Sequence, residues 1–345
     1  MSVVLASRKG AIARSRVKQC VAWCFTLLGF AVALAVAIVA PSPAKAATTP
    51  YDLVFGLVGS GNGLYAFMLV VLMVCYSLTP IIALVSGRKG AGLERYLARY
   101  PFRIAVGLAL CLWNVLGDVF EILPRPFFPG PAQIAGAFLE DSAFILHNTL
   151  YSLRLFAVGF IVGVFFGVST GIIIGWFAKA YYWVFPVLKI TGVIPAVAWM
   201  PFALTSFPTP FAAAAFLIVI CEWFPIAFLT AQGVRSTPKQ LYEAARTLGA
   251  GQRTLVFRVA VPHALPNIFT GISTANAYAF ATLVMSEMMG QPGGLGYYIN
   301  SSKVWSAYYK VFAAIVVMAI LFSLILKITE RVQRHALRWQ RGLIQ

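Results

Sequence analysis

The chain consists of apolar segments long enough to cross a membrane, separated by short gaps that hold most of its charged residues. An α-helix rises 1.5 Å per residue, so about 20 apolar residues cross the roughly 30 Å hydrocarbon core of a bilayer. Because 60% of the residues are hydrophobic and 11% are charged, the apolar surface is too large for one soluble core. The sequence therefore predicts an all-α polytopic membrane protein surrounded by lipid.

Eight membrane spans are predicted from these apolar segments. Basic clusters and turns rich in Pro or Gly interrupt them, because such residues end helices or lie outside the membrane. A Pro-rich connection at residues 123–131 is expected on the extracytoplasmic side. The spans are expected at about residues 20–40, 64–86, 104–122, 149–177, 183–207, 211–232, 267–289 and 311–328.

The formal net charge of +17 comes mainly from Lys and Arg residues that lie between or beyond the predicted spans. Basic residues gather before the first span, between the second and third spans, in the segment 233–266 and after the eighth span. Lys and Arg are enriched in cytoplasmic loops, so this pattern places both termini and the segment 233–266 in the cytoplasm. The charge therefore indicates membrane orientation, and no nucleic-acid partner is inferred from it.

Residues 1–100 are predicted to form an N-terminal extension with two spans, outside the core at residues 101–345. Residues 1–46 end in Pro-Ser-Pro-Ala-Lys-Ala, which also fits the end of a cleaved signal peptide. A retained membrane anchor and a removed signal peptide are both compatible with the sequence.

The fourth predicted span carries a glycine every four residues. On a helix this spacing leaves a groove along one face, where a neighbouring helix can approach closely and gain dispersion contacts that lipid would not supply. The pattern predicts a tightly packed helix bundle and is neutral about the substrate. The residues are Gly159, Gly163, Gly167, Gly171 and Gly175.

The fifth predicted span is interrupted by Pro195 and Pro201, with Trp199 between them. Each proline removes a backbone hydrogen bond, and broken helices at membrane depth are tolerated where they line a cavity or are packed in protein. Both a pathway segment and an ordinary kink remain open. Charged residues within spans are costly and are therefore further pathway candidates, namely Arg154, Glu222 and Glu287.

The segment 233–266 is polar and basic, although it lies between two apolar spans. Thr237 is expected to cap a helix that begins at Pro238, with Gln240 as its capping-box partner. Gly249 is expected to end this helix. A second short helix over residues 252–259 is expected to end at Pro262 and Pro266. Periodicity alone leaves open whether these helices lie on the membrane surface or bind a partner.

A specific pattern in this segment points to a family. Glu243-Ala244-Ala245, three residues, Gly249, nine residues and then Val-Ala-Val-Pro262 resemble the E-A-A loop of ATP-binding-cassette importer permeases. The departures are valines in place of Ile and Leu at the end of the motif. Residues 149–328 resemble the nitrate, sulfonate, taurine and bicarbonate branch of these binding-protein-dependent permeases. Residues 1–100 lie outside this resemblance.

The resemblance implies a type I importer transmembrane domain with six core helices and about two extra N-terminal helices, in the bacterial cytoplasmic (inner) membrane. It implies that Glu243, Ala244, Ala245 and Gly249 contact a cytoplasmic ATPase, with Pro262 completing the motif. Arg246, Arg253 and Arg258 are ion-pair candidates toward that partner, or else a solvated face. The implied partners are ATPase subunits, an extracytoplasmic solute-binding protein and a second permease copy or paralogue.

The chain shows no G-x-x-x-x-G-K-[ST] phosphate loop, so ATP and magnesium are expected on a separate ATPase chain and this chain is expected to be no enzyme. Its five cysteines and three histidines show no metal-ligand spacing, so neither a metal nor another cofactor is expected here. The branch suggests a small anion as substrate. The alternatives are an ion-gradient-driven secondary transporter that uses Glu222 and Asp118, and a membrane anchor that transports nothing.

Overall fold

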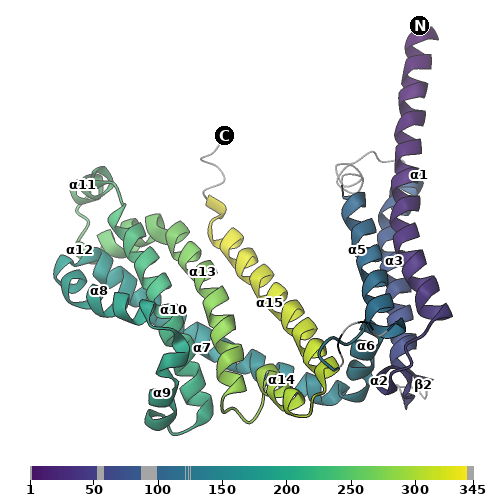
Figure 1. The fold of residues 1–345 in the computed structure, drawn as a ribbon. Helices are drawn as coiled ribbons and strands as arrows, with labels where there is room; N and C mark the ends of the chain where they lie inside the picture. The colour runs from purple at the N-terminus through teal and green to yellow at the C-terminus, as the bar shows by residue number, and fades with distance from the viewer. Residues whose placement is uncertain are drawn as a thin grey trace. The chain divides into compact units, whose positions relative to one another are not determined.

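The computed structural model describes residues 2–52, 58–86, 99–120, 122, 124 and 126–339. The chain packs as two compact units, of which unit 1 comprises Met1–Ser142 and Ser302–Ala313. Unit 2 comprises Ala143–Ser301 and Ala314–Gln345. Long helices dominate both units (Figure 1), so the predicted all-α class is confirmed.

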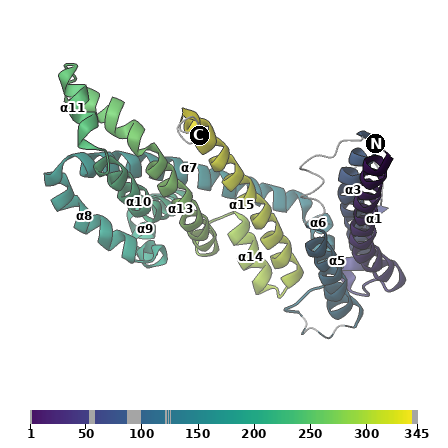
Figure 2. The same ribbon diagram turned by 90° about the horizontal axis from the view of Figure 1, so that it is seen from above.

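Unit 1 is built around three helices that lie side by side in Figures 1 and 2: α1 (Ser2–Val39), α3 (Gly61–Ser86) and α5 (Tyr100–Asn114). The backbones of α1 and α5 touch, because a Cβ atom on Gly107 would lie 2.7 Å from the carbonyl carbon of Gly29. Shorter elements complete this unit, namely α2 (Lys45–Thr48), β1 (Tyr51–Asp52), β2 (Val58–Gly59), the π-helix η1 (Val115–Val119) and α6 (Pro131–Glu140).

Buried polar contacts hold α6 in unit 1. The carboxylate of Asp118 is fully buried and accepts hydrogen bonds from the backbone N–H of Ala132 (3.1 Å) and from Nε2 of Gln133 (3.0 Å). This carboxylate therefore satisfies a donor at the N-terminal end of α6. At the other end of α6, Nζ of Lys310 lies 2.7 Å from Glu140 and 2.8 Å from Asp141.

Unit 2 contains the long helix α7 (Ser142–Trp176) and α10 (Pro210–Arg235), which pack face to face along the glycine ladder. A Cβ atom at any of the five ladder glycines would meet α10 within 2.9 Å. Each glycine faces one α10 residue, and the facing residues are also spaced by four: Ile218, Glu222, Ile226, Thr230 and Val234. The groove predicted from the sequence therefore has its occupant within the same chain.

The remaining elements of unit 2 surround this pair. Helix α10 also packs along α13 (Val261–Met288), and the two lie side by side in Figure 1. The others are α8 (Ala178–Val193), the 3₁₀ turn η2 (Ala196–Trp199), α9 (Met200–Ser206), α11 (Lys239–Thr247), α12 (Gln252–Thr254), the π-helix η3 (Leu255–Ala260), α14 (Leu295–Val304) and α15 (Tyr308–Ala336), the last two of which begin or end in unit 1.

By length and composition, seven of the described helices can cross a membrane. An eighth span results if α8 and the η2–α9 segment are counted together, although the chain bends by 103° between them. The bend lies at Ile194 and Pro195, where proline disfavours helix in the preceding residue. The protein is therefore a multi-pass membrane protein, and the predicted fifth span is a broken one.

Candidate functional site

The polar segment between α10 and α13 begins with α11, which starts at Lys239 rather than at Pro238. Pro238 is the N-cap residue, with extended backbone, and no side chain caps the helix. Thr237 is 6% exposed and its hydroxyl has no hydrogen-bond partner. The predicted capping box is therefore wrong, because Pro238 begins the helix one position later and the Thr237 side chain is buried.

Helix α11 ends in a Schellman motif, as the glycine predicted. The backbone of Gly249 has φ +79°, in the left-handed region that residues with a Cβ rarely adopt. The N–H of Gly249 donates to the carbonyl of Arg246 at 2.9 Å, and that of Ala250 donates to Ala245 at 3.0 Å. These two bonds satisfy the last carbonyls of the helix and reverse the chain direction.

One aromatic side chain, Tyr242, anchors α11 to the bundle. Its ring packs edge-on against Trp176 of α7 at 5.5 Å, and the same cluster includes Val234 of α10 and Ala260 and Ala264 near the start of α13. Tyr242 was not predicted as an anchor, because only the E-A-A motif and the apolar residues of this helix were considered. The signal available was an aromatic residue in an otherwise polar helix.

The other face of α11 is uncovered. Leu248 is 88% exposed and Leu241 is 45% exposed, and no residue of α11 is fully buried. Glu243, Ala244 and Arg246 are exposed as well, whereas Ala245 is half-buried. In both views α11 lies at the edge of unit 2 (Figures 1 and 2). An apolar face rimmed by charges is typical of an interaction surface.

After the turn, the chain is helical from Gln252 to Met288, through α12, η3 and α13. The expectation that Pro262 and Pro266 end a short helix is therefore wrong. The π-turns of η3 widen the helix just ahead of Pro262, where a proline ring would otherwise clash with a carbonyl four residues earlier. Arg253, Phe257 and Arg258 are exposed on this part of the helix. We call residues 237–262 the coupling loop.

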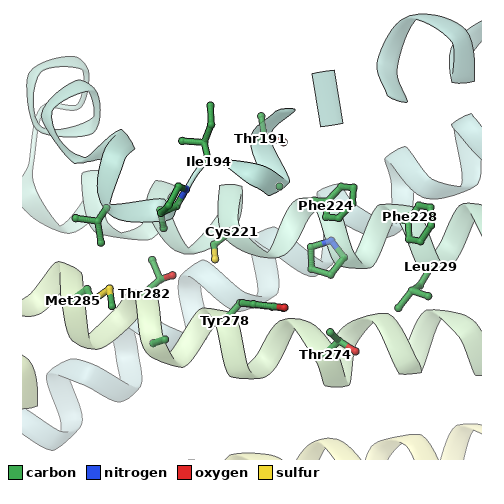
Figure 3. Close-up of a pocket in the computed structure, with 16 residues that line it drawn as sticks. Thr191, Ile194, Cys221, Phe224, Phe228, Leu229, Thr274, Tyr278, Thr282 and Met285 are labelled. Carbon is green, nitrogen blue, oxygen red and sulfur yellow. The ribbon is translucent and has the colours of Figure 1, made fainter. Parts of the chain in front are cut away.

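A pocket of about 540 Å³ lies where the fifth span is broken, between the α8–η2 bend, α10 and α13. We call it the broken-span pocket. Figure 3 shows Cys221, Phe224 and Phe228 on one helix facing Thr274, Tyr278 and Thr282 on the next. Thr191 and Ile194 approach from the α8 side, and Pro195 completes the wall at the bend.

The six pathway candidates do not come together in one site. Pro195 lines the broken-span pocket, whereas Trp199 and Pro201 lie in η2 and α9 beyond the bend. Arg154 is exposed on α7 and lies 5.3 Å from the ring of Phe211. Glu222 is a fully buried member of the ladder opposite Gly163, and neither carboxylate oxygen has a hydrogen-bond partner.

Glu287, the sixth candidate, holds the turn before α14. Its Oε2 accepts the N–H of Gly296 at 2.8 Å, while Oδ1 of Asn148 accepts Gly294 at 2.9 Å and Oγ of Ser152 accepts Leu295 at 2.8 Å. All three side chains are buried. They satisfy successive donors at the start of α14, which is a structural contact that periodicity did not predict.

In the described part of the chain, no group of three His, Cys, Asp or Glu residues could hold a metal ion. The features present are spans packed through small residues, a pocket at a broken span and an uncovered loop with an apolar face. Together they define the transmembrane component of a transport system.

Comparison with known proteins identifies the family. The model of the binding-protein-dependent transport system inner membrane component matches residues 163–341, and this chain belongs to that family. The match includes the coupling loop and most of the glycine ladder. The predicted resemblance is thereby confirmed, and residues 1–162 lie outside this match.

Several relatives are named as transport permeases. The bicarbonate transport system permease protein CmpB of Synechococcus elongatus is 31% identical over 256 residues, covering 69% of this chain and 88% of CmpB. An aliphatic sulfonates transport permease, SsuC of Bacillus subtilis, is 28% identical over 258 residues, covering 73% and 92%. The nitrate import permease NrtB of Leptolyngbya laminosa is 28% identical over 209 residues, covering 61% and 70%.

A solved structure has the same fold. The inward-facing MetNI methionine ABC transporter matches with a TM-score of 0.50 and 22% identity, over 57% of this chain and 98% of the matched chain. The predicted fold, a type I ABC importer transmembrane domain with additional N-terminal helices, is confirmed.

Proposed function

We propose that this chain is the permease subunit of an ATP-driven importer that moves a small solute into the cytoplasm by alternating access. The observation that carries the proposal is the uncovered apolar face of α11, which the Schellman turn at Gly249 presents away from the bundle. ATP would be bound and hydrolysed by a separate ATPase chain, which would also hold the magnesium ion. The bacterial inner membrane, with both termini in the cytoplasm, is the proposed location.

The coupling loop is connected to the helices that line the broken-span pocket. Tyr242 ties α11 to Trp176 and Val234, so a displacement of α11 is passed to α7 and α10. The unbroken helix from Gln252 to Met288 carries the loop directly into the wall that holds Thr274, Tyr278 and Thr282. Movement of a docked ATPase would therefore reposition the pocket wall, which is the lever that alternating access requires.

The proposed partners follow from the same arrangement. Two ATPase subunits would bind the coupling loops of two permease chains, which are copies or paralogues, and an extracytoplasmic binding protein would deliver the solute. Glu243, Ala244, Ala245 and Gly249 are proposed as the centre of the ATPase contact, with Arg246 and Arg253 at its rim. The division into an extension at 1–100 and a core at 101–345 is proposed with it. Named roles of the relatives suggest a nitrate, sulfonate, taurine or bicarbonate-type anion.

The proposal is tested by co-purifying the ATPase with the permease. We expect Glu243→Lys and Gly249→Asp to abolish ATPase association and uptake, because the first reverses the charge of the contact and the second places a charged side chain at its centre. Glu330→Lys, a charge reversal at an exposed position of α15, is the matched control. Association and uptake that survive both loop variants would sink the proposal.

A second candidate, an ion-gradient-driven transporter, is favoured by one observation: Glu222 is buried with both carboxylate oxygens unpaired. In contrast, both oxygens of Asp118, the other residue of this candidate, accept hydrogen bonds within unit 1. Uptake that collapses with an uncoupler at constant ATP, and that Glu222→Gln abolishes, would favour the second candidate.

A further inference from the structure

The broken-span pocket has a lining that ATPase coupling does not explain. None of its lining residues is Lys, Arg, His, Asp or Glu. Its polar side chains carry hydroxyls and one thiol, contributed by Thr191, Cys221, Thr274, Tyr278 and Thr282. The hydroxyls of Thr191 and Thr274 already donate to backbone carbonyls of their own helices, at 2.8 and 2.9 Å. The rest of the wall is aliphatic and aromatic. Hydrogen-bond donors are therefore present within an apolar surround that lacks a countercharge.

The size of the pocket distinguishes between substrate classes. Its volume is about 540 Å³. Nitrate and bicarbonate contain four heavy atoms and would fill only a small part of it. Volumes of about 300–1,000 Å³ are typical of pockets that enclose organic ligands.

The chemistry of the wall points in the same direction. A bare inorganic anion entering an uncharged apolar pocket would lose hydration that a few hydroxyls only partly replace. A sulfonate head group loses hydration in the same way, but an organic solute also gains free energy when its apolar body leaves water. Its head group can accept hydrogen bonds from Tyr278 and Thr282. Phe224 and Phe228 offer ring faces and edges to an aromatic body.

We propose that the broken-span pocket binds an organic solute, with an aliphatic or aromatic body and a hydrogen-bond-accepting head such as a sulfonate, in preference to an inorganic anion. This inference rests on the proposed permease function and names the substrate class of that function. The body lies against the stacked phenylalanines of α10, whose ring centroids are 5.7 Å apart, and the head group faces the hydroxyls of α13.

Cys221 provides a reporter within the pocket. In full-length permease reconstituted in lipid nanodiscs, with Cys20, Cys24, Cys75 and Cys111 replaced by Ala, N-ethylmaleimide alkylates the remaining thiol. Benzenesulfonate is the organic probe, with nitrate and bicarbonate compared at the same concentrations. At a concentration of about four times its Kd, benzenesulfonate is expected to slow alkylation about fivefold, whereas the inorganic anions leave the rate unchanged.

Matched variants locate the effect. A chain that keeps only Cys75, exposed on α3 in unit 1, controls for direct effects of benzenesulfonate on the reagent. Phe224→Ala is expected to raise the Kd for benzenesulfonate at least about threefold, a difference of about 0.7 kcal/mol at 25 °C, so that the same concentration slows alkylation only about twofold. Phe165→Ala removes an exposed α7 phenylalanine that does not line the pocket, and it should leave the protection intact.

Three results would overturn the inference. Protection by nitrate or bicarbonate equal to that by benzenesulfonate would make the pocket an inorganic anion site. Absence of protection by any probe would show that organic solutes do not bind there. Alkylation that changes with lipid acyl chain and not with the probes would make lipid the occupant. The coupling loop contains none of the residues that line the pocket. Loss of ATPase association therefore tests the permease proposal, whereas the alkylation experiment tests only the substrate class.

Discussion

The glycine ladder and the coupling loop are both built from small residues on helices, but their surroundings are opposite. Every ladder glycine of α7 lies against a side chain of α10, whereas nothing lies within 4 Å of a Cβ position at Gly249. The ladder glycines are required by close packing and the loop glycine by its backbone angle. The ladder therefore has its partner within the chain, and the loop presents an uncovered apolar face, which we propose binds the ATPase.

The largest effect is expected in the ladder. Gly167→Leu would place a side chain where a Cβ alone lies 2.7 Å from Cβ of Ile226. Overpacking of a closed interface costs about 1–3 kcal/mol or more. In a chain of 345 residues this corresponds to a fall of roughly 2–4 °C in the midpoint of thermal unfolding of the purified permease.

Two further variants sharpen this ladder prediction. Gly251→Leu, at a glycine with open space around it and φ −77°, should leave the midpoint unchanged. Adding Ile226→Ala to Gly167→Leu should recover part of the loss, because the two positions share one contact. A midpoint that stays unchanged in Gly167→Leu would contradict the observed ladder.

The ladder was predicted from the sequence, and its partner was not. A glycine every four residues on one long helix specifies a groove through helix geometry alone, and that signal is local. Which helix enters the groove depends on contacts between residues about 60 positions apart, and Glu222 gives no local sign that it is one of the contacting residues. The proline-broken fifth span was considered as a cavity wall, but the other lining residues were missed for the same reason, since Thr191, Cys221 and Tyr278 come from three separate segments.

The coupling loop was predicted only in part from its local sequence. Its motif predicted the exposed turn at Gly249, because a left-handed backbone is a property of one residue. The same reading failed at Thr237 and Pro262, where burial and a π-turn decide the local structure. Local rules therefore failed in this loop where contacts with the bundle override them.

A smaller effect, confined to binding, is expected for Leu248→Asp. Leu248 is 88% exposed, so the substitution should leave the unfolding midpoint of the isolated permease unchanged. Loss of an apolar contact with the ATPase should weaken association about tenfold, or about 1.4 kcal/mol. The measurement is titration of labelled permease with the purified ATPase.

Trp305→Asp is the control for this binding prediction, since Trp305 is 83% exposed in the turn between α14 and α15 and lies outside the loop. Equal ATPase affinity in Leu248→Asp and wild type would show that this face of α11 is not the docking surface.

Gly249→Ala is expected to have a more modest effect. A Cβ at φ +79° costs about 1–2 kcal/mol even though the space around it is open. Part of this cost would appear as a several-fold loss of ATPase affinity in the same titration. Gly251→Ala lacks the positive φ and should bind normally.

Gly249→Asn separates backbone strain from contact, because asparagine tolerates the left-handed region better than alanine. Affinity should therefore follow the order Gly, Asn, Ala at this position. An alanine variant that binds as well as wild type would show that the turn is not needed for docking.

The smallest effect is expected for Thr237→Val, which tests whether the Thr237 hydroxyl caps α11. If the hydroxyl capped α11, its removal would destabilise the permease by about 1 kcal/mol. The hydroxyl is instead buried without a partner, so a side chain of the same shape should be neutral or stabilise by up to about 1 kcal/mol. Thr237→Ser, which keeps the hydroxyl and removes a methyl group, should be less stable than Thr237→Val by thermal unfolding. The reverse order would restore the capping box and move the start of α11 back to Pro238.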